Sequence, residues 1–274
     1  MTDGEAVAAL SKSDRVLEPR EEIAEFIATQ EGRIGDVYRL SLEGLDPAQI
    51  AARLNVETAG FVYSYRANID AALDGRIANG PTLLKQTRSA LNGLISKGRA
   101  QLSVEALDLL ASHRNLVNQA LADLDPVMEA QADAEAKRAE VLQVESLKGL
   151  AGIYAFSYGW YIEKPVGDDE INTLIKVGRS IDVAARINEH RRGARAHIPE
   201  PLVSLRVYAT DQLKLSDVER TFHRLLSTAG HVNPRRETQE SRRQNEVGRE
   251  WFLTNVDFLD EIASTLHLRT VYQA

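Results

Sequence analysis

The spacing of hydrophobic residues divides the chain into two parts with different periodicities. From Arg20 to about residue 149, apolar positions recur every three or four residues, as in amphipathic helices. From residue 150 onward, short segments alternate between apolar and polar positions and are rich in β-branched and aromatic residues, as in strands. The change predicts a helical amino-terminal half followed by a smaller domain that combines strands with helices.

Residues that cap or end helices divide the helical part into segments. We expect a flexible arm over residues 1–20, a helix-turn-helix-like domain over residues 21–79, a helical connector over residues 80–149, and a second domain over residues 150–274. Within the connector, the apolar spacing predicts helices over residues 80–98, 103–124 and 129–149. The last of these is rich in Ala and Glu, which predicts a solvated helix or a short coiled coil through which the chain could self-associate.

A pair of helices is predicted around residues 46–73. Asp46 is a good N-cap, Pro47 suits the first helical position, and Gln49 completes a capping box. Asn55 then ends the first helix, because asparagine tolerates the left-handed conformation. The second helix carries an apolar stripe of Phe61, Tyr65 and Ile69.

This helix, turn and helix resemble the helix-turn-helix of sigma-like and response-regulator DNA-binding domains, over roughly Arg33–Leu73. In that alignment the second helix is the recognition helix, and its outward residues would contact DNA. They are Thr58, Val62, Tyr63 and Arg66. The alternative is a plain helical hairpin within a bundle.

The alternating segments of the second part predict four strands, at residues 151–162, 172–178, 201–210 and 249–255. Helices over residues 181–193 and 217–230 separate them, with Ser180 and Ser216 as the expected caps, and Asn255 caps a final helix. The predicted fold class is therefore α+β. A helical half precedes a small α/β sandwich whose sheet is mainly antiparallel.

Composition narrows the class of protein. The 274 residues contain no Cys, which excludes disulfides and cysteine-ligated zinc. No signal peptide and no membrane-spanning run is recognisable, so we expect a cytoplasmic protein without a membrane partner. The net charge is −7, but residues 1–149 hold 16 Lys/Arg and 23 Asp/Glu, whereas residues 150–250 hold 16 and 14. Phosphate contacts are therefore expected in the carboxyl-terminal half, where Arg191, Arg192 and Arg195 cluster.

Several polar residues of the second part stand where a site could form. Lys176 interrupts an apolar strand, Arg186 and His190 are one helical turn apart, and so are Glu219 and His223. Each also has an ordinary explanation. Lysine suits an edge strand, Arg and His suit a solvated helix face, and Glu219 completes a capping box with Ser216.

Together these residues resemble the GIY-YIG nuclease superfamily. Gly152, Ile153 and Tyr154 match its first motif, and Lys176, Val177 and Gly178 match its second. Arg186, His190 and Glu219 then follow in the expected order, and the resemblance covers about Ala151–Asn255. Lys176 replaces the second tyrosine, as in a branch found in phage and large-virus proteins whose members are often described only as DNA-binding. The sequence Glu250-Trp251-Phe252 also resembles that branch.

The resemblance implies a divalent-metal-dependent endonuclease that hydrolyses DNA phosphodiester bonds. Glu219 would bind Mg²⁺, Arg186 would hold the phosphate, Tyr154 or Lys176 would orient or deprotonate the water, and His190 would shuttle a proton or contact the phosphate. Gly178 and Arg179 would receive a phosphate at the strand end, with His223 as a further DNA contact.

We expect the catalytic candidates Tyr154, Lys176, Arg186 and Glu219 to converge on one concave surface. Three hypotheses remain open on the sequence. The chain is a Mg²⁺-dependent DNA endonuclease, a DNA-binding protein on the same fold without cleavage, or a helical interaction protein whose sheet domain is structural.

Overall fold

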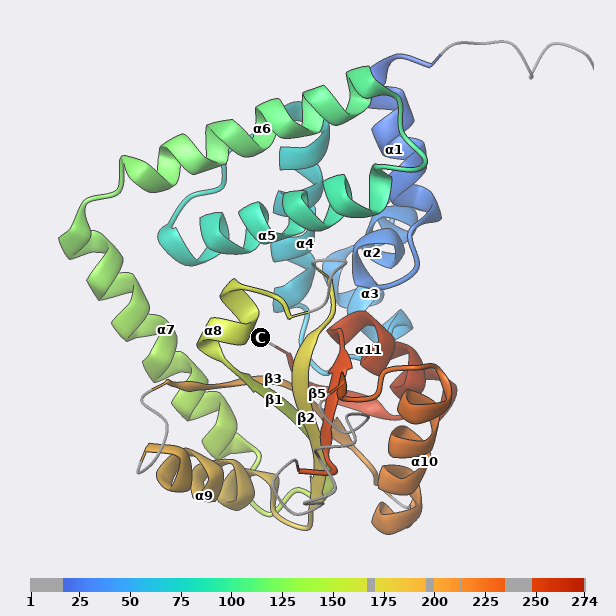
Figure 1. Cartoon of the computed structure of the whole chain (residues 1–274), viewed down its shortest axis with the longest axis vertical. Coiled ribbons are helices and arrows are strands. Elements are labelled where there is room, and N and C mark those ends of the chain that lie inside the picture. Colours follow the sequence, from blue (N-terminus) through green and yellow to red (C-terminus); the bar gives the residue numbers. More distant parts are fainter. Residues whose placement is uncertain (1–16, 167–170, 196–199, 212, 235–247, 274) are drawn as a thin grey trace, which may run out of the picture.

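Between residues 17 and 149, the helical periodicity of the amino-terminal half is realised as seven helices in the computed structural model (Figure 1). The structure describes residues 17–166, 171–195, 200–211, 213–234 and 248–273. No helix within those ranges is both long and apolar enough to cross a membrane. The seven helices are α1 (Pro19–Thr29), α2 (Arg33–Leu42), α3 (Pro47–Arg53), α4 (Gly60–Asp74), α5 (Pro81–Gly98), α6 (Val104–Ala122) and α7 (Pro126–Ser146).

Helices α1 to α6 share one hydrophobic core. The fully buried residues of this core include Ile23 of α1, Ile50 of α3, Val62 of α4, Leu91 of α5 and Leu110 of α6. Helices α5 and α6 therefore belong to the core of the helical half. Only α7 has the position of a connector, because it runs along one side of the molecule from the helical half to the sheet (Figure 1).

The capping chemistry of the predicted helix pair is confirmed. The Asp46 carboxylate accepts a bond from the Gln49 backbone at 2.9 Å, and the Gln49 side chain accepts one from the Asp46 backbone at 2.9 Å. Pro47 occupies the first turn, and Asn55 has a φ of 54°. The sequence therefore locates the end of α3 and the turn before α4.

The exposure of α4 differs from that of a recognition helix. Val62 is fully buried, so the prediction that it faces outward is wrong. The Arg66 guanidinium donates to the Ser41 hydroxyl at 3.2 Å and to the Leu45 carbonyl at 3.0 Å, and so ties α4 to the end of α2. Thr58 and Tyr63 are exposed. Helix α4 packs on α1, α2, α3, α5 and α6, which explains why so little of it remains open.

The carboxyl-terminal half is a five-stranded antiparallel sheet with helices, which confirms the α+β class. The strand order is β4-β2-β1-β3-β5, with every pair antiparallel. The strands are β1 (Gly152–Tyr158), β2 (Thr173–Ser180), β3 (Leu202–Ala209), β4 (Trp251–Thr254) and β5 (Arg269–Gln273). Sequence analysis did not predict β5, and it extended the first strand over residues that form a short helix.

That short helix is α8 (Gly159–Glu163), and α9 (Val183–Arg195), α10 (Leu215–Thr228) and α11 (Val256–Thr265) follow. Asn255 caps α11 as predicted, by accepting a bond from the Phe258 backbone at 2.9 Å. The other two caps are wrong. The N-cap of α10 is Lys214, so Ser216 lies inside the helix. Asp182 accepts the bond from the Ala185 backbone at 2.9 Å that Ser180 was expected to receive.

The sheet buries two faces. On one face, here called the α10 face, Ile153, Ala155 and Val177 pack against Val218 and Phe222 of α10. The opposite surface, here called the α9 face, carries Tyr154 and Phe156 of β1 together with Val183, Ala184 and Ile187 of α9. Because side chains alternate along a strand, neighbouring residues of β1 and β2 point to different faces.

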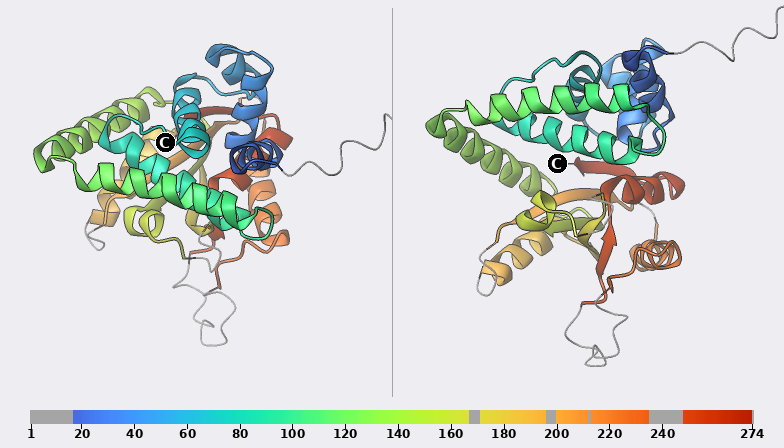
Figure 2. Two further views of the ribbon diagram at one scale, coloured as in Figure 1. Left: turned by 90° about the horizontal axis from the view of Figure 1, so that it is seen from above. Right: turned by 45° about the horizontal axis from the view of Figure 1, so that its top comes forward.

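The two halves meet along β5, where the turn between α3 and α4 continues the sheet. Val56 forms a parallel bridge with Thr270, and the Glu57 backbone donates to the Thr270 carbonyl at 2.9 Å. Figure 2 shows the helical half lying across this edge.

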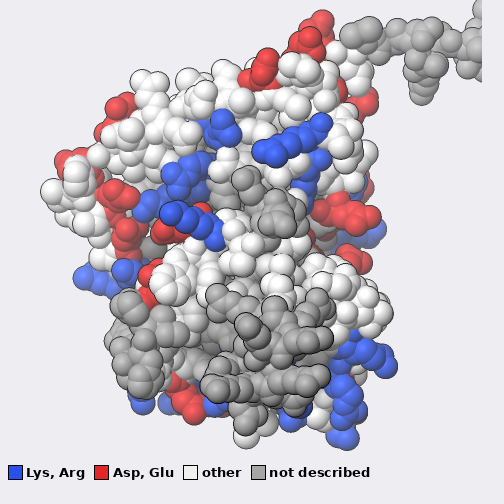
Figure 3. All heavy atoms as spheres, in the orientation of Figure 1, with Lys and Arg blue, Asp and Glu red and all other residues white. Residues whose placement is uncertain are grey.

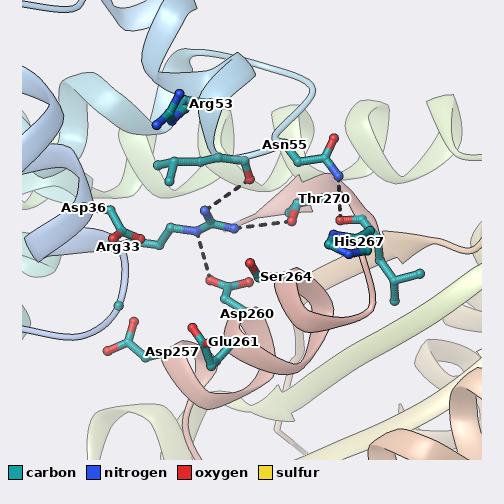
Figure 4. A pocket seen from close by; sticks show the side chains of 13 residues that line it. Arg33, Asp36, Arg53, Asn55, Asp257, Asp260, Glu261, Ser264, His267 and Thr270 are labelled. Atoms are coloured by element: carbon teal, nitrogen blue, oxygen red, sulfur yellow. Dashed lines mark hydrogen bonds and ion pairs between the residues drawn. The ribbon is translucent and has the colours of Figure 1, made fainter.

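A cluster of buried ion pairs links the two halves at this junction. Asp260 of α11 accepts from Arg33 at 3.3 Å, from Arg206 at 3.1 Å and from the Tyr208 hydroxyl at 2.8 Å. All four side chains are almost fully buried, so each charge has its partner inside the protein. Figure 4 shows the contact between Arg33 and Asp260.

Candidate active site

Tyr154 and Gly178 are paired across β1 and β2. A Cβ atom at position 178 would lie 2.6 Å from the Tyr154 hydroxyl oxygen and 2.7 Å from its ring, so the phenol ring lies directly over the glycine. Gly178 was predicted to let a phosphate approach the backbone. On the α9 face, the tyrosine occupies that space instead. The glycine therefore determines where the hydroxyl of Tyr154 is held.

His190 contacts that hydroxyl, and Arg186 lies near it. Nε2 of His190 lies 3.1 Å from the Tyr154 oxygen. The Arg186 guanidinium donates to the Glu189 carboxylate at 2.5 Å, and it is close enough to act on the pKa of Tyr154. The His190 ring packs 5.1 Å from Phe156 and 5.7 Å from Tyr154. Both residues lie on α9 one turn apart, as the sequence predicted.

The pKa values of this group favour neutral side chains between two cations. Burial, followed by the charges of Lys176 and Arg186, lowers the pKa of His190 to about 4. Burial also raises the pKa of Tyr154 above its ordinary value, although the neighbouring Arg186 acts in the opposite direction. At neutral pH, His190 is therefore uncharged and Tyr154 keeps its proton. A neutral imidazole beside a phenol can accept its proton.

Lys176 extends the positive charge along β2. Its ammonium lies 3.1 Å from Glu250 and 5.8 Å from the centre of the Phe156 ring, and its side chain is 16% exposed. The alternative of a lysine that faces water on an edge strand does not apply, because β4 pairs with this part of β2. An ammonium paired with a carboxylate provides charge for a phosphate more readily than it abstracts a proton.

Glu219 does not join the other candidates. It projects from α10, and its carboxylate lies 2.8 Å from the Arg179 guanidinium on the α10 face. The expectation that all the catalytic candidates share one surface is therefore wrong for Glu219. Arg179 follows Gly178 directly and so points to the opposite side of β2. Glu219 is nevertheless near enough to act on the pKa of Tyr154.

The donors present do not fit a resident divalent cation. Mg²⁺ needs oxygen ligands in near-octahedral geometry, usually from one or two carboxylates. Glu219 is held by Arg179, and Glu250 is held by Lys176. Among the described residues, no group of three or more His, Asp or Glu side chains could hold a metal ion. A metal at Glu219 would have to displace a guanidinium.

Some of the DNA contacts predicted on α9 and α10 are bonded to other groups of the protein, whereas others are exposed. Arg191 is paired with Glu140 of α7 and is only 17% exposed, so it anchors α9 to α7 rather than facing a ligand. His223 donates from Nε2 to the Val177 carbonyl at 2.8 Å, which ties α10 to β2. Arg192 is exposed. The side chain of Arg195 lies outside the described residues, as do residues 235–247 with four arginines of the polar loop.

Sequence reasoning missed the partners that complete the site. Glu250 was noted only for its resemblance to a family branch, yet it pairs with Lys176. Trp251 was noted only in the same resemblance, and Phe156 was not proposed as a site residue, although their rings meet edge to face at 5.7 Å. The alternation of β1 placed Phe156 on the face of Tyr154. The position of Trp251 depends on β4 pairing with β2, which no local pattern predicts.

A protein-family model matches part of the carboxyl-terminal half of the chain. Residues 153–267 match the model of the T5orf172 domain, a phage-associated domain related to nuclease-type folds. The matched region begins within β1 and ends just after α11, so it contains every residue of the candidate site and none of the helical half. No curated protein and no solved structure matches the chain.

Proposed function

We propose that the α9 face hydrolyses phosphodiester bonds and that the chain is a DNA endonuclease. The observation that carries this proposal is the contact of the Tyr154 hydroxyl with the neutral His190, in a group whose pKa values also respond to the charges of Arg186 and Lys176. The match to the T5orf172 domain and the resemblance to the GIY-YIG superfamily support the same chemistry. Exposed Thr58 and Tyr63 of the helical half are proposed as additional DNA contacts.

The proposed reaction uses Tyr154 and His190 as a proton relay from the attacking water. Tyr154 takes a proton from the attacking water as it passes its own proton to Nε2 of His190. The resulting hydroxide attacks phosphorus, the bond to the leaving oxygen breaks, and that oxygen takes a proton from solvent. Arg186 and Lys176 neutralise the phosphate and stabilise the additional charge of the transition state. A positioned acid–base group of this kind contributes about 10²- to 10⁴-fold in rate.

A second candidate function is DNA binding without cleavage. The pairing of Glu219 with Arg179 favours it, because the carboxylate that the superfamily resemblance assigns to a metal already has a cationic partner. The two functions share the phosphate contacts and differ only in the chemical step.

Nicking of a supercoiled plasmid separates them. Wild type should nick DNA, and Tyr154→Phe should reduce the rate by about 10²-fold or more while gel-shift affinity stays the same. Arg220→Ala on α10 is the control, because its side chain is 75% exposed and outside the site. Assays with Mg²⁺ and with a chelator test the predicted cofactor. Wild type that shifts DNA but nicks it under neither condition would favour binding alone.

A further inference from the structure

A continuous strip of aromatic rings runs along the α9 face away from Tyr154. Tyr154, Phe156 and Tyr158 are alternate residues of β1, and the first two rings are stacked 6.0 Å apart. Trp251 of β4 lies 5.7 Å from Phe156 and 5.6 Å from Tyr158, nearly parallel to the tyrosine at 20°. Strands β1 and β4, which flank β2, therefore present their rings as one surface.

The strip continues beyond the sheet onto α8 and reaches solvent there. Tyr161 lies 6.4 Å from Tyr158, and Trp160 lies 5.7 Å from Tyr161. Exposure rises along the strip, from 2% at Tyr154 to 46% at Trp160. Ile162 is also exposed on the same short helix. The Tyr154 end of the strip is therefore part of the core of the α9 face, whereas the α8 end opens to solvent.

We infer that the open end of this aromatic strip, at Tyr158, Trp160 and Tyr161, stacks the unpaired bases of single-stranded DNA next to the site at Tyr154. The inference rests on the proposed function, because it names the form of DNA that the same site accepts. Every base has a flat π-face, so rings spaced along a groove bind single strands with little sequence preference. Bases in a relaxed duplex are stacked on each other and reach such rings only where the two strands separate, as they do locally in a supercoiled plasmid.

Charge along the strip suits a strand whose backbone follows the rings. Lys176 and Arg186 lie at the Tyr154 end, and Lys164 directly follows α8. Figure 3 shows Lys and Arg side chains gathered on the front of the molecule where α5 lies above α8. Two carboxylates, of Glu163 and Glu200, also lie at α8. They repel phosphate there and favour bases on the rings, with the backbone toward the cations.

Two oligonucleotides of equal length and charge test the inference. One is oligo(dT), and the other has abasic sites in place of its bases. Fluorescence anisotropy in the presence of a chelator measures affinity without cleavage. Wild type should bind oligo(dT) at least tenfold more tightly than the abasic strand. Trp160→Ala should weaken oligo(dT) binding about 5- to 150-fold and leave abasic binding unchanged, because it removes one stacking ring. Trp160→Phe should restore most of the difference.

The matched control is Leu116→Ala on α6, an exposed apolar residue at 41% that lies outside the strip, and it should change neither affinity. Equal binding of the two oligonucleotides by wild type would overturn the inference. Unchanged oligo(dT) affinity in Trp160→Ala would also overturn it. The same holds if that variant changes only the self-association of the protein, measured by sedimentation. Because the readout is binding, a protein that never nicks plasmid can still pass this test. Nicking by wild type without a preference for oligo(dT) would refute the strip alone.

Discussion

The ring of Tyr154 lies over the Cα atom of Gly178, and the tyrosine hydroxyl is within 2.6 Å of where a side-chain carbon would begin. A short strand pairing thus sets the position of the central hydroxyl of the site. The glycine of the second motif is explained by this packing, without a phosphate against the backbone.

Gly178→Ala should therefore act through Tyr154. The added methyl group displaces the phenol from His190 and Arg186, so the nicking rate should fall about 10²-fold, and overpacking should cost about 1–3 kcal/mol of unfolding free energy. Plasmid nicking and urea unfolding measure the two effects. Gly93→Ala in α5 is the control, since nothing lies within 4 Å of its added carbon, and it should be neutral or slightly stabilising. Wild-type nicking by Gly178→Ala would contradict the proposed role of Tyr154.

The low pKa of His190 predicts an acid limb of the rate at unusually low pH. The proton acceptor should remain neutral down to about pH 5, so single-turnover nicking should be nearly flat from about pH 8 to that point and fall toward pH 4. Because folding lowers this pKa, the contribution of His190 to stability is complete above about pH 6.5 and is lost as pH falls toward about 4. An NMR titration of the ring measures the pKa directly. A midpoint near 6.5 would contradict the buried, cation-flanked geometry.

The pairing of Glu219 with Arg179 predicts a mild effect for Glu219→Gln. The glutamine keeps the shape of the side chain and loses only its charge, so unfolding free energy should fall by about 1 kcal/mol or less. Nicking should remain within about tenfold of wild type, with the same response to Mg²⁺. Each factor of ten in rate is 1.36 kcal/mol, so a metal ligand would cost several such factors. A loss of that size with an intact fold would return the metal-binding role to Glu219.

Two consecutive arginines of α9 should behave differently. Arg191→Ala leaves the Glu140 carboxylate without its partner, so it should destabilise the protein by about 1–3 kcal/mol. Arg192→Ala should preserve stability and weaken DNA binding about equally for all sequences, with the slope of log affinity against log salt reduced by about 1. Thermal melts and salt titrations distinguish the two effects. The reverse assignment would show that α9 is rotated relative to the described arrangement.

Asp260 should be the most sensitive charged residue of the junction. Asp260→Asn leaves Arg33 and Arg206 buried without a countercharge, and breaking such a cluster costs about 3–5 kcal/mol. Urea unfolding measures this loss. The same substitution at Asp217, in an exposed pair with Arg220, should cost about 1 kcal/mol or less. Equal effects at the two positions would show that the junction is solvated.

Local signals were sufficient where one short segment determines the structure. The capping box at Asp46 and the cap at Asn255 depend on residues three positions apart, and both are confirmed. The α+β class followed from periodicity. Ser216 failed as a cap because α10 begins two residues earlier, at a position without a capping side chain.

Contacts between distant segments could not be predicted in the same way. Glu140 and Arg191 are 51 residues apart, and Arg33 and Asp260 are 227 apart, so no local pattern links them. The face of β2 on which Arg179 lies could be predicted, because strict alternation places its side chain opposite that of Gly178. This alternation argued against a surface shared with Glu219. The prediction followed the order of the family motifs instead.

The bridge between Val56 and Thr270 bears on whether the chain is modular. Cutting the chain at residue 150 would leave β5 with an unsatisfied edge and Asp260 without Arg33, while the helical half would lose the support of its turn. The two halves should consequently melt in a single cooperative transition. The sheet half of this chain thus relies on the helical half to cover its last strand, so the two parts are expected to fold as one unit.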